Sequence, residues 1–181
     1  MAKKSMTAAE LIASTANDPA YLAMKAEQDR KRAELRKILD ADQAELVAEL
    51  NATGIEPVKN VWDLVSRPNN YDDALEVLTS HLLKPHHPRV MEGIVRSLAM
   101  RHLSGMTALW EKFAQMYLET PNDQDIEEPA RRGLKFALIL GLEALMSDEV
   151  ADLLRQLVYD SKGHQHADCL EDLLAKQGRV G

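Results

Sequence analysis

The chain has 181 residues, enough for a single domain with a real hydrophobic core. With 45% apolar residues, 28% charged residues and a net charge of −7, its composition is that of a soluble globular protein. This charge argues against extended binding to duplex nucleic acid, which needs a broad positive surface. A single cysteine, Cys169, excludes an internal disulfide framework and fits a reducing compartment. Aromatic residues make up only 4%, which favours helix over sheet.

The N-terminal residues 1–18 are expected to form a mobile segment. The stretch from Thr7 to Ala16 contains Glu10 and is too short and too polar for a signal sequence. No run of apolar residues approaches the length of a membrane span. The longest one, Phe136 to Leu142, is interpreted as a buried central helix. We therefore expect a cytoplasmic protein without a membrane partner.

A long helix follows this segment. Asn17, Asp18 and Pro19 predict its start, because a short polar side chain caps a helix and proline suits the first turn. The helical pattern continues from Ala20 to about Thr53, and Gly54 is a suitable C-terminal cap. Asp40 and Gln43 resemble a capping pair, which predicts a break near these residues.

Residues 19–66 are interpreted as N-terminal capping helices that cover the first repeat. The alternative is dimerisation through a leucine seam, which consists of Leu35, Leu39, Leu46 and Leu50. Sustained heptads are too few to demand a coiled coil, so a monomer or a weak homodimer is expected. Pro57 to Val65 should form a short helix with Trp62 and Val65 packed inward.

The stretch from Tyr71 to Leu103 predicts a helical hairpin. Asp72 or Asp73 can cap its first helix, and Pro85 and Pro88 separate the two helices. Each helix has an apolar stripe at helical spacing, formed by Leu75, Leu78, Leu82 and Leu83 in the first and by Val90, Met91, Ile94, Val95 and Leu98 in the second. Gly93 should let another helix approach closely.

A degenerate copy of this hairpin begins about forty residues further on. Glu92-Gly93-Ile94 aligns with Arg132-Gly133-Leu134, and Pro88 aligns with Pro129. A third, weaker pair runs from Glu149 to Tyr159 and from Ala167 to Lys176. Because a single pair cannot bury its own stripe, residues 67–181 are expected to form a stack of about three helix pairs.

This pattern resembles HEAT/armadillo-type repeats, and the stretch VWDLVSRPNNYDDALEVLTSHLLKPHHPRVMEGIVRSLA is similar to a poorly characterised group of bacterial HEAT-repeat proteins. The likeness covers roughly Val58 to Lys176. It implies an all-α fold, a right-handed α-α superhelix capped by the long N-terminal helix. It also implies a concave face, lined by the second helices, that holds a partner.

Basic residues are concentrated on the expected second helices, although residues 104–160 contain eleven acidic and five basic residues. If these helices line a concave face, a basic strip can bind an acidic segment or phosphate groups. Alternatively, Glu92 neutralises its neighbours at helical pair spacing. The candidate partner-binding residues are Arg89, Glu92, Arg96, Arg131, Arg132 and Lys135.

Histidines are concentrated in two places that suggest metal binding. His81, His86 and His87 lie around the elbow between the two helices of the hairpin, which contains Pro85 and Pro88. The stretch HQHADC at 164–169 combines two histidines with an aspartate and a cysteine. None of these spacings matches an established metal site, and the sequence has no HExxH, CxxC, GxSxG or phosphate-binding loop. We therefore expect no metal, no cofactor and no catalytic residue.

The sequence favours a non-enzymatic protein-interaction module: an adaptor, a regulatory subunit or an immunity-type inhibitor that binds an unidentified protein partner. The alternative is a HEAT-like protein that contacts phosphate or nucleic acid through the basic residues, for example a DNA-repair-type enzyme. Nucleic acid is the less expected ligand because the chain is acidic.

Overall fold

The computed structural model describes residues 7, 16, 18–67 and 71–177, and within them every regular element is a helix. The expected all-α class is therefore confirmed for this part of the chain. The chain divides into two compact units, Met1–Ala41 and Asp42–Gly181, which we describe separately. The predicted mobile segment 1–18 lies outside the described residues, apart from Thr7, Ala16 and Asp18.

The first unit consists mainly of α2 (Pro19–Asp42). Its predicted start is confirmed, since Asp18 Oδ1 accepts a hydrogen bond of 2.9 Å from Ala20 N and Pro19 is the first helical residue. Ion pairs support the middle of the helix, where Arg30 binds Glu27 at 2.8 Å and Glu34 at 3.1 Å. None of its residues is buried.

The predicted break is confirmed at Gln43, which separates α2 from α3 (Ala44–Ala52). Gln43 does not cap α3 through its side chain; its Oε1 instead accepts from Val61 N at 3.1 Å. Leu46 and Leu50 are fully buried in the second unit. Because these two side chains are already part of a core, they are not available to the proposed leucine seam.

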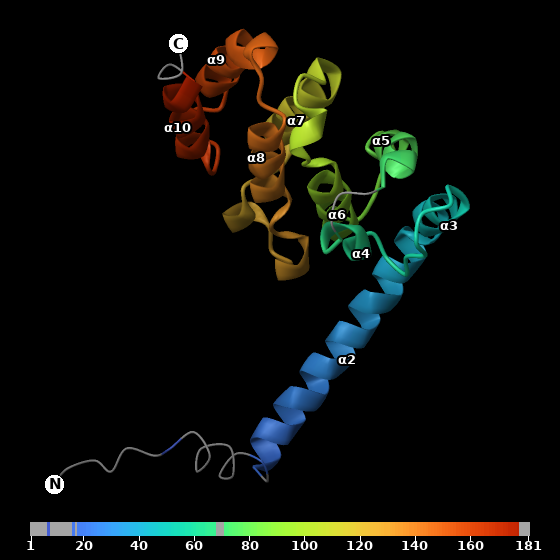
Figure 1. The fold of residues 1–181 in the computed structure, drawn as a ribbon. Helices are drawn as coiled ribbons and strands as arrows, with labels where there is room; N and C mark the ends of the chain where they lie inside the picture. Colours follow the sequence, from blue (N-terminus) through green and yellow to red (C-terminus); the bar gives the residue numbers. More distant parts are fainter. Residues whose placement is uncertain (1–6, 8–15, 17, 68–70, 178–181) are drawn as a thin grey trace, which may run out of the picture. The chain divides into compact units, whose positions relative to one another are not determined.

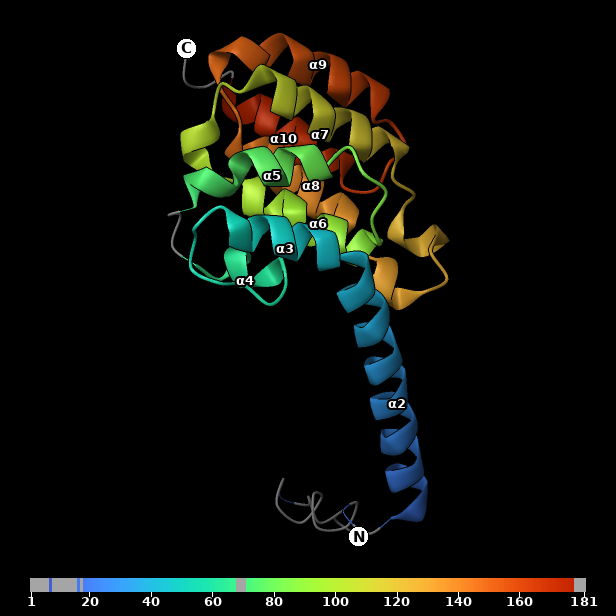
Figure 2. The same ribbon diagram turned by 90° about the vertical axis from the view of Figure 1, so that its right-hand side faces the viewer.

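The second unit continues with α4 (Trp62–Val65), α5 (Leu75–His81), α6 (Pro88–Leu98), α7 (Thr107–Glu119), α8 (Leu134–Ala144), α9 (Ala151–Asp160) and α10 (Ala167–Gln177). Figures 1 and 2 show α3, α5, α7 and α9 in one layer and α6, α8 and α10 in a second layer, with α4 against α6. Within the pairs, α5 packs on α6, α7 on α8 and α9 on α10. The helix that packs most extensively on α6 is α8.

The short helix before Tyr71 differs from its prediction. It begins at Trp62 rather than Pro57, and Val58, Val61 and Leu64 are buried instead of Trp62 and Val65. Trp62 is half-buried because it lies against α6, where its indole N–H donates to the carbonyl oxygen of Arg89 at 3.1 Å.

The predicted alignment of Gly93 with Gly133 is wrong. Gly93 lies inside α6, where an added Cβ would be 2.5 Å from Val61 Cγ1, so the expected close approach is confirmed. Gly133 instead precedes α8 with a φ of +101°. The close contact in α8 occurs at Gly141, where a Cβ would be 2.5 Å from Phe113 Cε2. The positions at which the helices approach most closely therefore do not follow the alignment of the sequence repeat.

The elbow between α5 and α6 also differs in detail. Neither Asp72 nor Asp73 caps a helix through its side chain; both lie in a 3-10 turn, Asp72–Ala74, that precedes α5. Pro88 is the first residue of α6 as predicted, and His87 Nδ1 accepts from Arg89 N at 3.1 Å as the cap. In α8 most of the predicted apolar run is buried, but Phe136 is 40% exposed.

Leu138→Ala tests the helix packing. Leu138 is fully buried on α8, so this change should lower the free energy of unfolding by about 2–5 kcal/mol through lost burial and the remaining cavity. Chemical denaturation measures the loss, with Leu83→Ala as the control because Leu83 is 74% exposed. A loss below about 1 kcal/mol for Leu138→Ala would contradict the assigned core.

Gly141→Ala tests the close approach of α7 and α8. Alanine normally stabilises a helix interior by about 1 kcal/mol relative to glycine. Here the new methyl group would meet the fully buried ring of Phe113, so we expect a loss of about 1–3 kcal/mol instead. Thermal and urea denaturation check the sign, and an increase in stability would show that the α7–α8 contact is looser than described.

Candidate functional site

The structure brings three of the six candidate partner-binding residues together on α6. Arg89 Nη1 donates to Glu92 Oε2 at 2.6 Å, and Arg96 Nε donates to Glu92 Oε1 at 3.0 Å. The Glu92 side chain is only 3% exposed, and the Arg89 guanidinium lies 4.0 Å above the Trp62 ring. One buried carboxylate therefore binds both arginines, and its negative charge compensates one of their two positive charges.

The other three strip residues do not join this cluster as a shared basic surface. Arg131 Nε binds Glu128 at 2.7 Å, and Arg132 donates from Nε and Nη2 to the carbonyl oxygen of Ile126. Lys135 is 1% exposed; its Nζ donates to Thr120 O at 2.6 Å and lies 2.9 Å from His164 Nδ1. Burial lowers the pKa of Lys135, against the opposing effect of Asp123 and Asp125. Its ammonium is a structural group.

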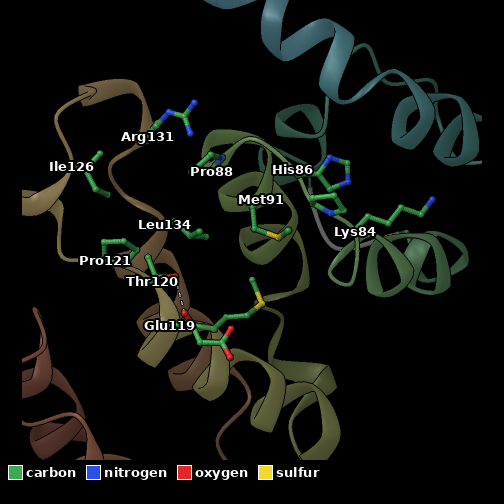
Figure 3. Close-up of a pocket in the computed structure, with 12 residues that line it drawn as sticks. Lys84, His86, Pro88, Met91, Glu119, Thr120, Pro121, Ile126, Arg131 and Leu134 are labelled. Atoms are coloured by element: carbon green, nitrogen blue, oxygen red, sulfur yellow. Dashed lines mark hydrogen bonds between the residues drawn. The ribbon is translucent and has the colours of Figure 1, made fainter.

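A pocket of about 410 Å³ lies between the α5–α6 elbow and the segment that connects α7 to α8 (Figure 3). Lys84 and His86 are on its elbow side, and Pro121 and Ile126 are on the opposite side. Most of its lining is apolar, contributed by Pro85, Pro88, Met91, Met116, Pro121, Ile126 and Leu134. Pockets of this volume accommodate a small molecule or a large side chain.

The polar groups of this pocket are few and lie beside the apolar lining. They belong to Lys84, His86, Glu119, Thr120 and Arg131. Arg131 is the one member of the predicted strip that lines the pocket. It is half exposed, as is its partner Glu128, and exposed ion pairs of this kind are weak.

His86 belongs to a chain of hydrogen bonds behind the pocket wall. Its Nδ1 lies 3.0 Å from Asp42 Oδ2, and its Nε2 lies 2.9 Å from His81 Nδ1. The side chain of His86 is 5% exposed and that of His81 is fully buried. Because both ring nitrogens of His86 are bound within the chain, neither is free to exchange a proton with a molecule in the pocket.

The hydrogen-bond chain ends at two glutamates of α3 and at Lys84. His81 Nε2 lies 3.2 Å from Glu49 Oε2 and 3.2 Å from Lys84 Nζ. Lys84 Nζ binds Glu45 Oε1 at 2.8 Å and Glu49 Oε1 at 3.4 Å. The histidines stand out in the sequence, whereas Asp42, Glu45 and Glu49 lie more than thirty residues before them and carry no recognisable pattern. No local motif joins these residues, so only folding brings them together.

The HQHADC loop does not assemble a metal site in the structure. His164 faces the ammonium of Lys135, and burial, followed by this positive charge, lowers the pKa of His164. The ring of His166 lies against that of Phe136, with centroids 5.3 Å apart. Cys169 is partly exposed, and burial, followed by the nearby Asp168, raises the pKa of its thiol.

Comparison of the chain with protein-family models, with curated proteins and with solved structures finds no match in any of the three. The relationship to HEAT repeats therefore stays a prediction. Among the helices of the described residues, none combines the length and the apolar character that crossing a membrane requires.

The cap of α6 should make stability depend on pH. Burial, and then the charge of Arg131, lowers the pKa of His87 against the opposing effects of Glu128 and Asp42. The unfolded chain therefore binds a proton at His87 more readily than the folded chain does. The contribution of His87 to stability is complete above about pH 6.5 and is lost as the pH falls below this value. Protonation would also remove the Nδ1 acceptor of Arg89 N.

His87→Asn keeps a capping acceptor but removes the titration. We expect urea denaturation at about pH 7.5 and about pH 5.5 to show a smaller loss of stability on acidification than in the unmodified chain. His81 and His164, whose pKa values burial also lowers, should account for the remaining loss. An unchanged pH dependence would mean that His87 does not titrate in this range.

Proposed function

We propose that this chain is a non-enzymatic protein-interaction module, and that its partner inserts an apolar side chain into the pocket between the α5–α6 elbow and the α7–α8 connection. The 410 Å³ pocket is the observation that carries this proposal. Its apolar lining and its few polar groups are typical of a site that receives one anchor residue.

Two methionines allow this pocket to accept side chains of different shapes. Met91 and Met116 both line it, and the flexible, polarisable thioether adapts to different occupants. Arg131 also lines the pocket. Its guanidinium is paired with Glu128 only through an exposed and therefore weak ion pair, so it can bind another carboxylate. The expected ligand is therefore a protein segment with an apolar residue next to a carboxylate.

The repeat organisation belongs to the same proposal. We propose that α5/α6, α7/α8 and α9/α10 are HEAT-like repeats, which is supported by the pairwise packing of these helices and by their order in two layers (Figure 2). In such a stack, consecutive connections between the helices of a pair lie side by side, and a groove between them is a natural place for a partner segment.

Phosphate or nucleic-acid binding has less support. Of the five basic residues predicted to form a strip, Arg89 and Arg96 bind the carboxylate of Glu92, and Lys135 is buried. A continuous row of unpaired cations, which such ligands require, is not formed by these residues.

Selection of peptides from a random displayed library tests the proposal directly. We expect binders that share a large apolar residue beside Asp or Glu. Their addition should shift the ¹³C-methyl NMR signals of Met91 and Met116, while Met146, which does not line this pocket, should stay unchanged. Binders that leave the Met91 and Met116 signals in place would contradict the proposed site.

Substitutions then separate the pocket from the rest of the surface. Met116→Glu should weaken peptide binding by about tenfold or more, because it puts a charge into an apolar site. Leu83→Glu adds the same charge at an exposed residue outside the pocket and should leave binding unchanged. Equal effects of the two changes, or tight binding of single-stranded DNA that Arg131→Ala abolishes, would overturn the proposal.

A further inference from the structure

Three acceptor groups that do not line the pocket converge beside the α5–α6 elbow. Glu45 and Glu49 come from α3, one turn apart, and His81 is the last residue of α5. One oxygen or nitrogen from each of them lies within 4.8 Å of the others. These residue types are the oxygen and nitrogen ligands that divalent metal ions take in proteins.

Asp42 decides which ring nitrogen of His81 carries a proton. The Asp42 carboxylate accepts from His87 N through both of its oxygens, at 3.1 Å each, and its Oδ2 faces His86 Nδ1. Since an ionised carboxylate only accepts hydrogen bonds, the proton of a neutral His86 must be on Nδ1. Its Nε2 is then an acceptor, and His81 must donate to it from Nδ1.

A neutral His81 therefore presents the lone pair of Nε2, not an N–H, toward Glu49 Oε2 at 3.2 Å. An acceptor that faces a second acceptor at this distance is unfavourable unless a cation lies between or beside them. In this structure the cation is the ammonium of Lys84, which lies 3.2 Å from His81 Nε2 and 2.8 Å from Glu45 Oε1. The three acceptors thus form a cation site with an internal occupant.

We propose that Glu45, Glu49 and His81 bind a divalent transition-metal ion of the zinc type, which takes the place of the Lys84 ammonium. One imidazole nitrogen and two carboxylate oxygens form a set of three protein ligands, and water completes such a coordination shell. Lys84 can leave without disturbing the fold, because its long side chain is 37% exposed.

The surroundings of the three ligands support a built site. The His81 imidazole is fully buried and held in orientation by His86 and, through it, by Asp42. Zinc-binding histidines characteristically donate their second N–H to such an acceptor, which fixes the tautomer of the ring. Glu45 and Glu49 are 67% and 39% exposed, so they can move onto an ion that enters from solvent.

Calorimetric titration of the full chain with Zn²⁺, and with Co²⁺ followed by its visible spectrum, tests the proposal. We expect one ion per chain and an affinity that Glu45→Gln and Glu49→Gln each lower. Lys84→Gln removes the competing ammonium and should raise the affinity about tenfold or more. Lys176→Gln is the matched control, since it removes the same charge from an exposed pair with Glu143 and should change nothing.

Asp42→Asn provides a second test that does not alter a metal ligand. Because it disturbs the residue that orients His86 and His81, it should lower Zn²⁺ affinity by about 10–100-fold. His102→Gln, which changes an exposed histidine paired with Asp72, should have no effect. Zn²⁺ should also raise the melting temperature of the unmodified chain, and less so that of Glu49→Gln.

Two results would overturn the proposal. The first is an absence of Zn²⁺ and Co²⁺ binding by Lys84→Gln, the variant in which the site has no internal cation. The second is binding that persists unchanged in both Glu45→Gln and Glu49→Gln, which would place the ion elsewhere, for example on the His164–His166 loop. In either case Lys84 would be the permanent partner of the three acceptors.

Discussion

The carboxylate of Asp42 holds the elbow on which both candidate sites depend. It accepts from the backbone N–H of His87 at the start of α6 and from the ring of His86. A negative charge at this place also suits the positive end of the α6 dipole. The elbow is therefore set by a residue far back in the sequence, and with it the wall of the pocket and the orientation of His81.

Internal pairing of charge governs what the surface can offer to a partner. Glu92 is buried between Arg89 and Arg96, and its carboxylate is also covered by Gly133, where a Cβ would be 3.1 Å from Oε2. Lys135 is more deeply buried than the arginines, and the Tyr117 ring, a carbonyl oxygen and His164 replace water around its ammonium. Most of the basic residues that the sequence predicted to bind a partner therefore make contacts within the fold.

The pocket and the cation site share two side chains, those of Lys84 and His86. His86 lines the pocket with one part of its ring and binds His81 and Asp42 through its two nitrogens. Its tautomer follows from Asp42, and the same tautomer makes His81 an acceptor. A buried imidazole in this position has a clear physical role without catalysis, since each of its nitrogens is already bound.

Periodicity and turn chemistry in the sequence were sufficient for the local elements. They predicted the start of α2 at Pro19, the break at Gln43 and the start of α6 at Pro88, because caps and prolines act on neighbouring backbone groups alone. Apolar spacing also identified Leu98 and Leu138 as core residues, and both are fully buried.

Contacts between distant segments were decided only by the tertiary structure. The repeat in the sequence aligned Gly93 with Gly133. In the structure the glycine of α8 that allows a close helix contact, as Gly93 does in α6, is Gly141. Asp42, Glu45 and Glu49 carried no motif. The two glutamates meet His81 because α3 packs on α5, and Asp42, the last residue of α2, meets His86 across 44 residues of sequence. Local propensity acts within a few residues, whereas burial and hydrogen-bond pairing are settled when separate helices stack, and for this reason the sites became visible only in the fold.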